Sequence, residues 1–217
     1  MKPFVAILLT LLVVRPLDAH PHIFVDTGVE VHTDAGGRVT HLTVTWAYDA
    51  FYSLLITEDY GLDSDGDAVL TEAEEAALNG FDMNWDAGFN GDLVATLDGS
   101  ALSLSRPRGY TTTMSEGRLV TTHLRDVAGT PSLAGRQLVI KPYDVTFYTA
   151  YDVTLPVTVE GPPLCTISRE VPQMNEELSS LRQMLAQVPP DADPEDANLP
   201  NAGGAFATRI EVACSAP

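Results

Sequence analysis

The sequence predicts a mainly β protein: a β-sandwich-like domain with a helix–acidic loop–helix insertion and one helix in the C-terminal region. Apolar and polar residues alternate along most of the chain, which is the pattern of strands that bury one face. The chain of 217 residues contains 16 glycines and 15 prolines, which punctuate these segments as in sandwiches of short strands. Three stretches break the alternation and are predicted as helices.

The strands are predicted where the alternation is clearest. Residues 23–31 and 42–46 are the first two. Asp98-Gly99 indicates a hairpin between residues 93–97 and 101–104, because glycine accepts a positive φ in a tight turn. Further strands are predicted at residues 119–124, 137–140, 145–155 and 206–214.

Two of the predicted helices, at residues 49–60 and 71–78, flank an acidic loop. They belong to an insertion of about residues 49–90 in a single β-rich domain that spans residues 20–217. The third helix has apolar residues at helical spacing and stops at Pro189-Pro190; these residues are Met174, Leu178, Leu181, Leu185 and Val188. An acidic, proline-rich loop follows at residues 189–204.

Residues 1–19 have the features of a secretory signal peptide. Lys2 precedes a short apolar run, and Ala19 suits the last position before cleavage. The run is too short to span a bilayer, which takes about 20 apolar residues. We therefore expect a periplasmic protein with no stable membrane insertion after cleavage; the alternative is an uncleaved amphipathic anchor.

The net charge of the chain limits the classes of partner that it can bind. Lys and Arg number 12 against 30 Asp and Glu, which gives a net charge of −18. A nucleic-acid-binding protein needs the opposite sign to displace counterions from phosphates, so we expect no nucleic-acid partner. Divalent cations are the natural partners of such a negative field.

Cys165 and Cys214 are the two cysteines of the chain. In an oxidising compartment such a pair is expected to form one disulfide. The alternative, a reactive thiol, lacks a neighbouring histidine or a CxxC spacing.

The segment from Asp63 to Glu74 resembles the calcium loop of an EF-hand. Carboxylates fall at loop positions 1, 3, 5 and 12, and calcium takes six to eight oxygen ligands. Leu70, at position 8, is expected to pack inward. The predicted ligands are Asp63, Asp65, Asp67, the backbone carbonyl of Val69, Thr71 through a water, and Glu74.

Position 6 of the loop departs from the EF-hand pattern. It is normally glycine because the chain turns sharply there, and here it is Ala68. A left-handed alanine costs about 1–2 kcal/mol, which predicts weakened calcium binding. The alternative is a solvated acidic turn in which Thr71 caps the following helix and Glu74 completes a capping box.

Signal cleavage after Ala19 would place His20-Pro21-His22 at the mature N-terminus. An amine and two imidazoles suit zinc, nickel, cobalt or copper. Pro21 has no amide hydrogen, so binding must use side chains and not a deprotonated amide. Further candidate ligands are His123, Asp144 and Asp152.

The alternative for His20 and His22 is a polar, flexible chain end. The remaining histidines are interpreted more simply. His32, at a strand end, and His41, opposite the apolar face of its strand, are expected to be surface residues.

Several segments together resemble a bacterial family of exported proteins of unknown function. They are His20-Pro-His22-Ile-Phe-Val-Asp26, Val44-Thr-Trp46, the acidic segment 63–74, the hairpin strand 94–99 and Tyr143-Asp144-Val-Thr-Phe-Tyr148. Members resemble the periplasmic component of an uncharacterised ABC-type transport system and often lie near nickel/cobalt permeases. The resemblance implies periplasmic metal handling with an inner-membrane metal or ABC-type permease as partner. The family tends to have Asp-Pro-Thr-Tyr-Tyr where this chain has Asp144-Val-Thr-Phe-Tyr148, which leaves the role of that segment open.

These observations favour a periplasmic divalent-metal-binding accessory protein with a calcium loop. One alternative is a protein-interaction sandwich in which calcium only rigidifies a loop. Another is a copper oxidative enzyme that uses an N-terminal histidine, with His123 as the second imidazole. No GxSxG, HExxH or glycine-rich phosphate loop occurs in the sequence, so we do not expect a hydrolase.

Overall fold

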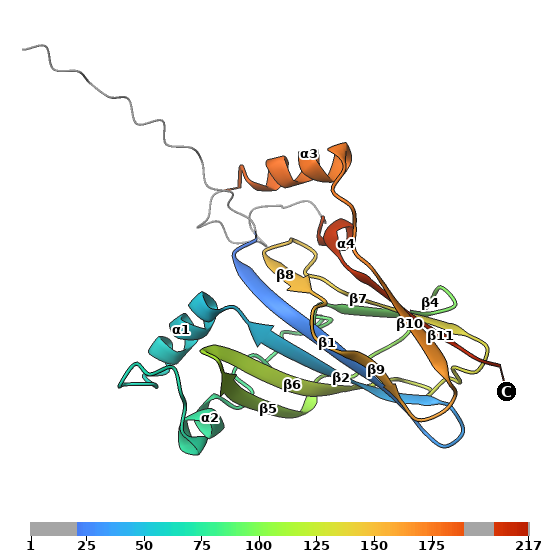
Figure 1. Ribbon diagram of the computed structural model, residues 1–217, viewed down its shortest axis with the longest axis horizontal. Helices are drawn as coiled ribbons and strands as arrows, with labels where there is room; N and C mark the ends of the chain where they lie inside the picture. The colour runs from blue at the N-terminus through green and yellow to red at the C-terminus, as the bar shows by residue number, and fades with distance from the viewer. Residues whose placement is uncertain (1–20, 189–201, 217) are drawn as a thin grey trace, which may run out of the picture.

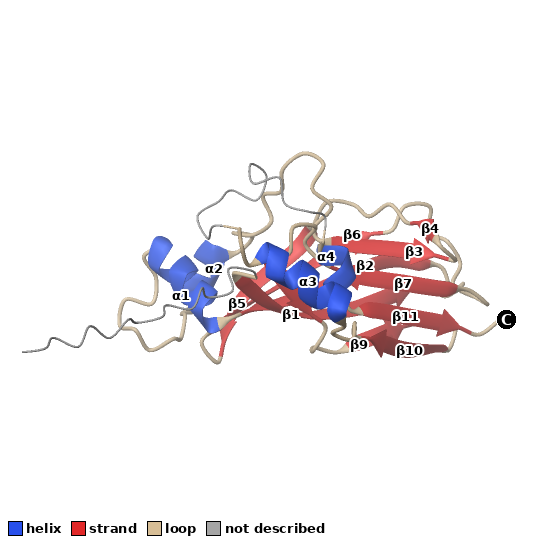
Figure 2. Ribbon diagram, turned by 90° about the horizontal axis from the view of Figure 1, so that it is seen from above, coloured by secondary structure: helices blue, strands red, loops and turns tan. Residues whose placement is uncertain are grey.

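The computed structural model describes residues 21–188 and 202–216, which form two β-sheets with four helices around them (Figures 1 and 2). One six-stranded sheet has the order β5-β6-β2-β1-β8, with β9 also paired to β1. The other, five-stranded sheet has the order β10-β11-β7-β3-β4. The predicted β-sandwich-like class is therefore confirmed.

The strands of the six-stranded sheet are β1 (Ile23–Thr33), β2 (Val39–Tyr48), β5 (Arg108–Ser115), β6 (Arg118–Asp126), β8 (Thr149–Asp152) and β9 (Val157–Glu160). Those of the other sheet are β3 (Leu93–Leu97), β4 (Ser100–Ala101), β7 (Gln137–Pro142), β10 (Cys165–Glu170) and β11 (Arg209–Cys214). The helices are α1 (Ala50–Asp59), α2 (Glu72–Leu78), α3 (Glu176–Leu185) and α4 (Gly203–Phe206).

The core lies where the alternating faces of the two sheets meet. Val29 and Val31 of β1 are buried together with Ile140 of β7 and Val212 of β11. Gly28, Glu30 and His32 alternate with these valines along β1 and face away from this core, because successive residues of a strand point to opposite faces. The alternation in the sequence therefore predicts most of the buried side chains of β1, β2, β3 and β11; Ile23 is only half-buried, and Ala47 is buried outside the alternation.

Residues 145–155 do not form the single strand that their apolar pattern predicts. The Asp144 carboxylate accepts hydrogen bonds from the N–H of Thr146 at 2.8 Å and the N–H of Thr149 at 3.0 Å, which closes a turn. Phe147 has a left-handed φ of 59° within this turn. Only Thr149–Asp152 forms a strand, β8, because side-chain capping competes with strand hydrogen bonds.

Three strands lack a clear sequence signal. β5 is largely exposed and rich in threonine, and it lies at the edge of its sheet. β9 and β10 are short and mostly exposed. β5 and β10 lack the apolar alternation by which strands are recognised, and the alternation of β9, in which Val157 is buried, covers only four residues.

The predicted helical insertion is present between β2 and β3. Asp49 caps α1 by accepting a hydrogen bond from Tyr52 N–H at 2.9 Å. Thr71 and Glu74 form the predicted capping box of α2. The insertion is tied to the six-stranded sheet, because Leu119 N–H donates to Ser53 Oγ, and α1 and α2 contact β6 and β5 (Figure 1).

The last predicted helix and the last strand are present where the sequence predicts them, but their boundaries differ from the prediction. The predicted helix is α3, which Asn175 caps through Leu178 N–H. The last strand begins at Arg209 and not at Phe206, because Phe206 belongs to α4 and its ring stacks on Phe147.

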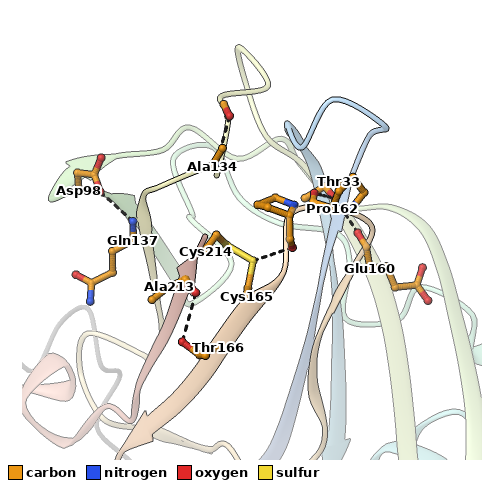
Figure 3. Close-up of a disulfide and its surroundings, with 12 residues drawn as sticks. Thr33, Asp98, Ala134, Gln137, Glu160, Pro162, Cys165, Thr166, Ala213 and Cys214 are labelled. Atoms are coloured by element: carbon orange, nitrogen blue, oxygen red, sulfur yellow. Dashed lines mark hydrogen bonds between the residues drawn. A yellow bond between two sulfur atoms is a disulfide. The ribbon is translucent and has the colours of Figure 1, made fainter. Parts of the chain in front are cut away.

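The predicted disulfide between Cys165 and Cys214 is present (Figure 3). The two residues are directly opposed in the β10–β11 pair, so the covalent link joins the two strands at this point. In the part of the chain that the structure describes, no helix is both long and apolar enough to cross a membrane. The predicted signal peptide and most of the acidic loop, residues 189–201, lie outside the described residues.

Candidate functional site

The acidic loop between α1 and α2 gathers the first three predicted calcium ligands. One carboxylate oxygen from each of Asp63, Asp65 and Asp67 lies within 4.8 Å of the others. Three converging carboxylates repel one another unless a cation lies between them. The spacing of aspartates at every second loop position therefore brings together the kind of ligand set that a hard divalent cation requires.

Backbone N–H groups shape the loop around Asp63. Its Oδ1 accepts a hydrogen bond from Asp67 N–H at 3.1 Å, and its Oδ2 accepts one from Ala68 N–H at 3.2 Å. Ala68 adopts the predicted left-handed conformation, with φ of 59°. The folded loop therefore already includes the conformational cost of a left-handed alanine at this position.

Glu74 connects the two ends of the loop. Its Oε1 accepts a hydrogen bond from Asp63 N–H at 3.2 Å, and its Oε2 accepts one from Thr71 N–H at 2.8 Å. The hydrogen bonds from Thr71, together with the one from Asp63, lower the pKa of Glu74, so its carboxylate is held in the ionised form. Leu70 is buried, as predicted, and anchors the loop on the core.

The other predicted calcium ligands lie in the same loop but outside the three-carboxylate group. Val69 is 64% exposed, and its backbone carbonyl is its only possible ligand because the side chain is apolar. Thr71 is the N-cap of α2. The capped acidic turn and the calcium loop are therefore compatible descriptions of one segment.

The N-terminal histidines are only partly described. His20 lies outside the described residues. His22 precedes β1, its N–H donates to the Tyr148 carbonyl at 2.8 Å, and its ring stacks on that of Tyr148 with a centroid distance of 4.6 Å. Burial against this ring lowers the pKa of His22, which favours the neutral imidazole that a metal ion binds.

The predicted acidic partners of His22 lie just before β8 and in β8, which pairs with β1. Asp144 is engaged in the turn that precedes β8. Asp152 lies beside Asp26 in the parallel β1–β8 pair, and burial and the Asp26 carboxylate raise its pKa. Asp26 itself forms an ion pair with Arg118 at 2.6 Å.

Asp92 was not singled out by the sequence. Burial and then the nearby Asp144 carboxylate raise its pKa to about 7, although the hydroxyl of Tyr151 donates a hydrogen bond to it at 2.9 Å. One aspartate in a chain rich in acidic residues carries no local signal, and only the fold brings it next to Asp144.

His123 lies inside the core and is 0% exposed. Its ring packs edge-on against Trp46 at 4.7 Å and against Trp85 at 5.6 Å between centroids. No group of three potential ligands among the described residues includes His123 together with His22, Asp144 or Asp152. His123, enclosed by the tryptophans and outside any such group, is not positioned as the second histidine of the copper enzyme alternative.

A second group of potential ligands was missed by the sequence analysis. Glu30, His32 and Glu160 each place one ligand atom within 4.8 Å of the others. Glu30 and His32, two residues apart on one strand, share a face and could have been noticed. Glu160 could not, because its place beside His32 depends on the pairing of β1 with β9.

Comparison with known proteins identifies a family but no function. No curated protein matches the chain. A family model described as "Protein of unknown function (DUF1007)" matches residues 5–214, which is nearly the whole chain. The chain therefore belongs to the DUF1007 family of proteins of unknown function.

Proposed function

We propose that this protein is a periplasmic divalent-metal-binding accessory protein, and that its acidic loop is a calcium site. The observation that carries the proposal is the convergence of three carboxylates, from Asp63, Asp65 and Asp67, within 4.8 Å in a loop between two helices. Calcium prefers such oxygen-rich sites and tolerates irregular geometry. The net charge of −18 adds a general attraction for cations.

The remaining ligands follow from the loop. The Val69 carbonyl and Thr71, through a water, complete the oxygen set. Glu74 joins it as a bidentate ligand by turning its carboxylate from its capping contacts toward the ion. Because the loop is already turned around Asp63 by two N–H groups, little further ordering is needed when calcium binds. We expect an affinity of about 10⁻⁴–10⁻³ M, as in calcium modules outside the cytoplasm.

Calcium is expected to stabilise the protein through Glu74. With a dissociation constant in that range, 10 mM calcium adds about 1–3 kcal/mol to the free energy of unfolding. Glu74→Gln should remove most of this gain, because glutamine retains the capping box but loses the charge and the bidentate ligand. Thermal melts with calcium and with a chelator measure the effect.

The matched control is Glu72→Gln, which removes the same charge from the exposed first turn of the same helix. This variant should keep the wild-type response to calcium. A melting temperature that calcium does not change in the wild-type protein, or an equal calcium shift in Glu74→Gln, would contradict the calcium site.

The transition-metal part of the proposed function rests on His20 and His22. A free N-terminal amine and two imidazoles offer three nitrogen ligands for zinc, nickel, cobalt or copper. Tyr148 holds the His22 ring at the start of β1, which limits the freedom of one ligand before a metal binds. Such a site could receive a metal ion from, or deliver it to, an inner-membrane metal or ABC-type permease.

Correctly processed protein is expected to bind one more equivalent of zinc or nickel than a His20→Ala, His22→Ala variant. Isothermal titration of both proteins measures the difference, and mass spectrometry of the exported protein reports its first residue. Calcium binding by the acidic loop is the internal control and should be equal in both. Equal uptake of the transition metal would exclude the N-terminal site.

A further inference from the structure

A cluster of two glutamates and two histidines lies across three adjacent strands of the six-stranded sheet. In the strand register, His32 of β1 is directly opposite His41 of β2 on one side and Glu160 of β9 on the other. Glu30 precedes His32 by two residues and so projects from the same face of β1. Neighbouring strands lie about 4.8 Å apart, which is close enough for these side chains to meet over the sheet.

The side chains converge on the His32 ring. Its Nε2 lies 3.3 Å from Oε2 of Glu30, and its Nδ1 lies 3.3 Å from Oε2 of Glu160. One ligand atom from each of the three residues falls within 4.8 Å of the others. Ligands bound at about 2.0–2.2 Å from one ion must have such separations from one another.

The imidazole is held in place from a second side. The His41 ring stacks on the His32 ring at 4.2 Å with an angle of 8° between the planes. The Thr43 hydroxyl oxygen lies 3.0 Å from Nε2 of His32, and the Thr40 hydroxyl oxygen lies 2.9 Å from Nδ1 of His41. Contacts of this kind orient a ligating histidine before a metal arrives.

The position of Glu160 is also fixed by the fold. The Thr33 hydroxyl oxygen lies 2.9 Å from the Glu160 carbonyl oxygen and 2.6 Å from the Pro162 carbonyl oxygen, and its one hydrogen is shared between these two acceptors (Figure 3). These contacts attach the end of β9 to the end of β1. The third member of the cluster is therefore placed by backbone contacts that do not depend on its carboxylate.

The charges of the cluster are not balanced by lysine or arginine. Within residues 21–188 and 202–216, the charged-group contacts of Glu30 and Glu160 are with His32 alone. The nearby Arg108 is engaged with Asp126 at 2.6 Å. A ligating histidine binds a metal ion as the neutral imidazole, so the two carboxylates would supply a charge of −2, which one divalent cation neutralises.

We propose that Glu30, His32 and Glu160 form a site for a zinc-like transition-metal ion, in which a water completes four-coordination. An imidazole ligand favours zinc over calcium, which binds oxygen ligands. The Glu160 side chain is 63% exposed and that of His32 20% exposed, so one side of the site is open to solvent. The site uses none of the residues of the acidic loop or of the N-terminal histidine pair.

The test uses the full chain in a His20→Ala, His22→Ala background with calcium present, so that the two sites of the proposed function do not contribute. Cobalt, a spectroscopic substitute for zinc, is titrated and followed by its visible absorption, and zinc is then added to displace it. One equivalent of cobalt with the intense absorption of a four-coordinate ion is expected. His32→Gln and Glu160→Gln should each weaken binding at least tenfold.

The control is Glu170→Gln, which neutralises an exposed glutamate on β10 outside the cluster and should bind cobalt as the parent does. Circular dichroism and melting without metal show whether each variant is folded; Glu160 is exposed enough that its substitution leaves the core untouched. Absence of bound cobalt and zinc in the parent, or unchanged affinity in both folded cluster variants, overturns the proposal. Because the background lacks the N-terminal histidines, these results do not depend on whether that pair binds metal.

Discussion

Replacing His123 with leucine is expected to make the protein more resistant to acid. Burial between two tryptophans, and then the charge of Arg125, lower the pKa of His123 to about 3. Neither ring nitrogen has a hydrogen-bond partner among the described residues. In the unfolded chain the same imidazole has a pKa near 6.5, so the unfolded state binds the extra proton between pH 6.5 and pH 3.

The sign of this pH dependence follows from the linkage between proton binding and folding. Where the unfolded state binds more protons than the folded state, the free energy of unfolding falls as the pH falls. His123 should therefore cost the wild-type protein about 3 kcal/mol between pH 7 and pH 4. Leucine has a similar volume and binds no proton. The His123→Leu variant should therefore remain folded and should not lose stability through this residue at low pH.

Urea unfolding of the two proteins at several pH values measures the effect as the difference in unfolding free energy. The variant should gain about 3 kcal/mol over the wild-type protein on going from pH 7 to pH 4. Subtracting the wild-type curve removes the contributions of groups that both proteins share. A difference that does not vary with pH would show that His123 is not held neutral by the core.

Replacing Asp92 with asparagine is expected to have the opposite pH dependence. The pKa of Asp92 is raised to about 7 by burial and by Asp144, so the folded state keeps a proton that the unfolded chain loses above about pH 4. The free energy of unfolding therefore falls as the pH rises from 4 to 7. Asparagine cannot ionise, still accepts the hydrogen bond from Tyr151, and tolerates the left-handed φ of 47° at this position.

Asp92→Asn should thus gain about 3–4 kcal/mol over the wild-type protein between pH 4 and pH 7.5. Asp98→Asn is a suitable control, because Asp98 also has a left-handed φ of 48° but its pKa is lowered, by hydrogen bonds from Gln137 N–H and Arg136. That control should not become more stable as the pH rises. If Asp92→Asn follows the wild-type curve throughout, Asp92 is ionised in the folded protein at pH 5.

The two effects oppose each other over the same pH range. In the difference between the wild-type protein and the double variant, the contribution of His123 is therefore largely offset by that of Asp92. This difference in unfolding free energy should vary less between pH 4 and pH 7 than the difference for either single variant, because the remaining titratable groups are shared by all of these proteins.

Much of the fold could be predicted because its signals are local. The alternation in residues 23–31 and 42–46 identified β1 and β2, and the spacing of leucines identified α3. The Thr71–Glu74 capping box and the left-handed Ala68 follow from the residues of one loop. These features depend on residues close together in the chain, where side-chain type limits the backbone directly.

The errors also have physical causes. Residues 145–155 alternate as a strand would, but the Asp144 side chain closes a turn within this segment. The alternation of apolar residues gives no sign of this turn. β5 is an edge strand whose threonines show little apolar pattern. The surface position predicted for His32 agrees with its half-buried ring, but its neighbours Glu30, His41 and Glu160 come from the pairing of three strands and have no signal in the sequence.

The class of the fold follows from the alternation along most of the chain, and the acidic loop and the disulfide follow from the type and spacing of a few residues. The enclosure of His123 by tryptophans, the approach of Asp92 to Asp144 and the position of Glu160 beside His32 depend on long-range strand pairing. The reason is the strand order. Pairing β1 with β9 and β2 with β6 joins segments far apart in the chain. The free energy that selects this register comes from burying a whole sheet face, not from any local pattern.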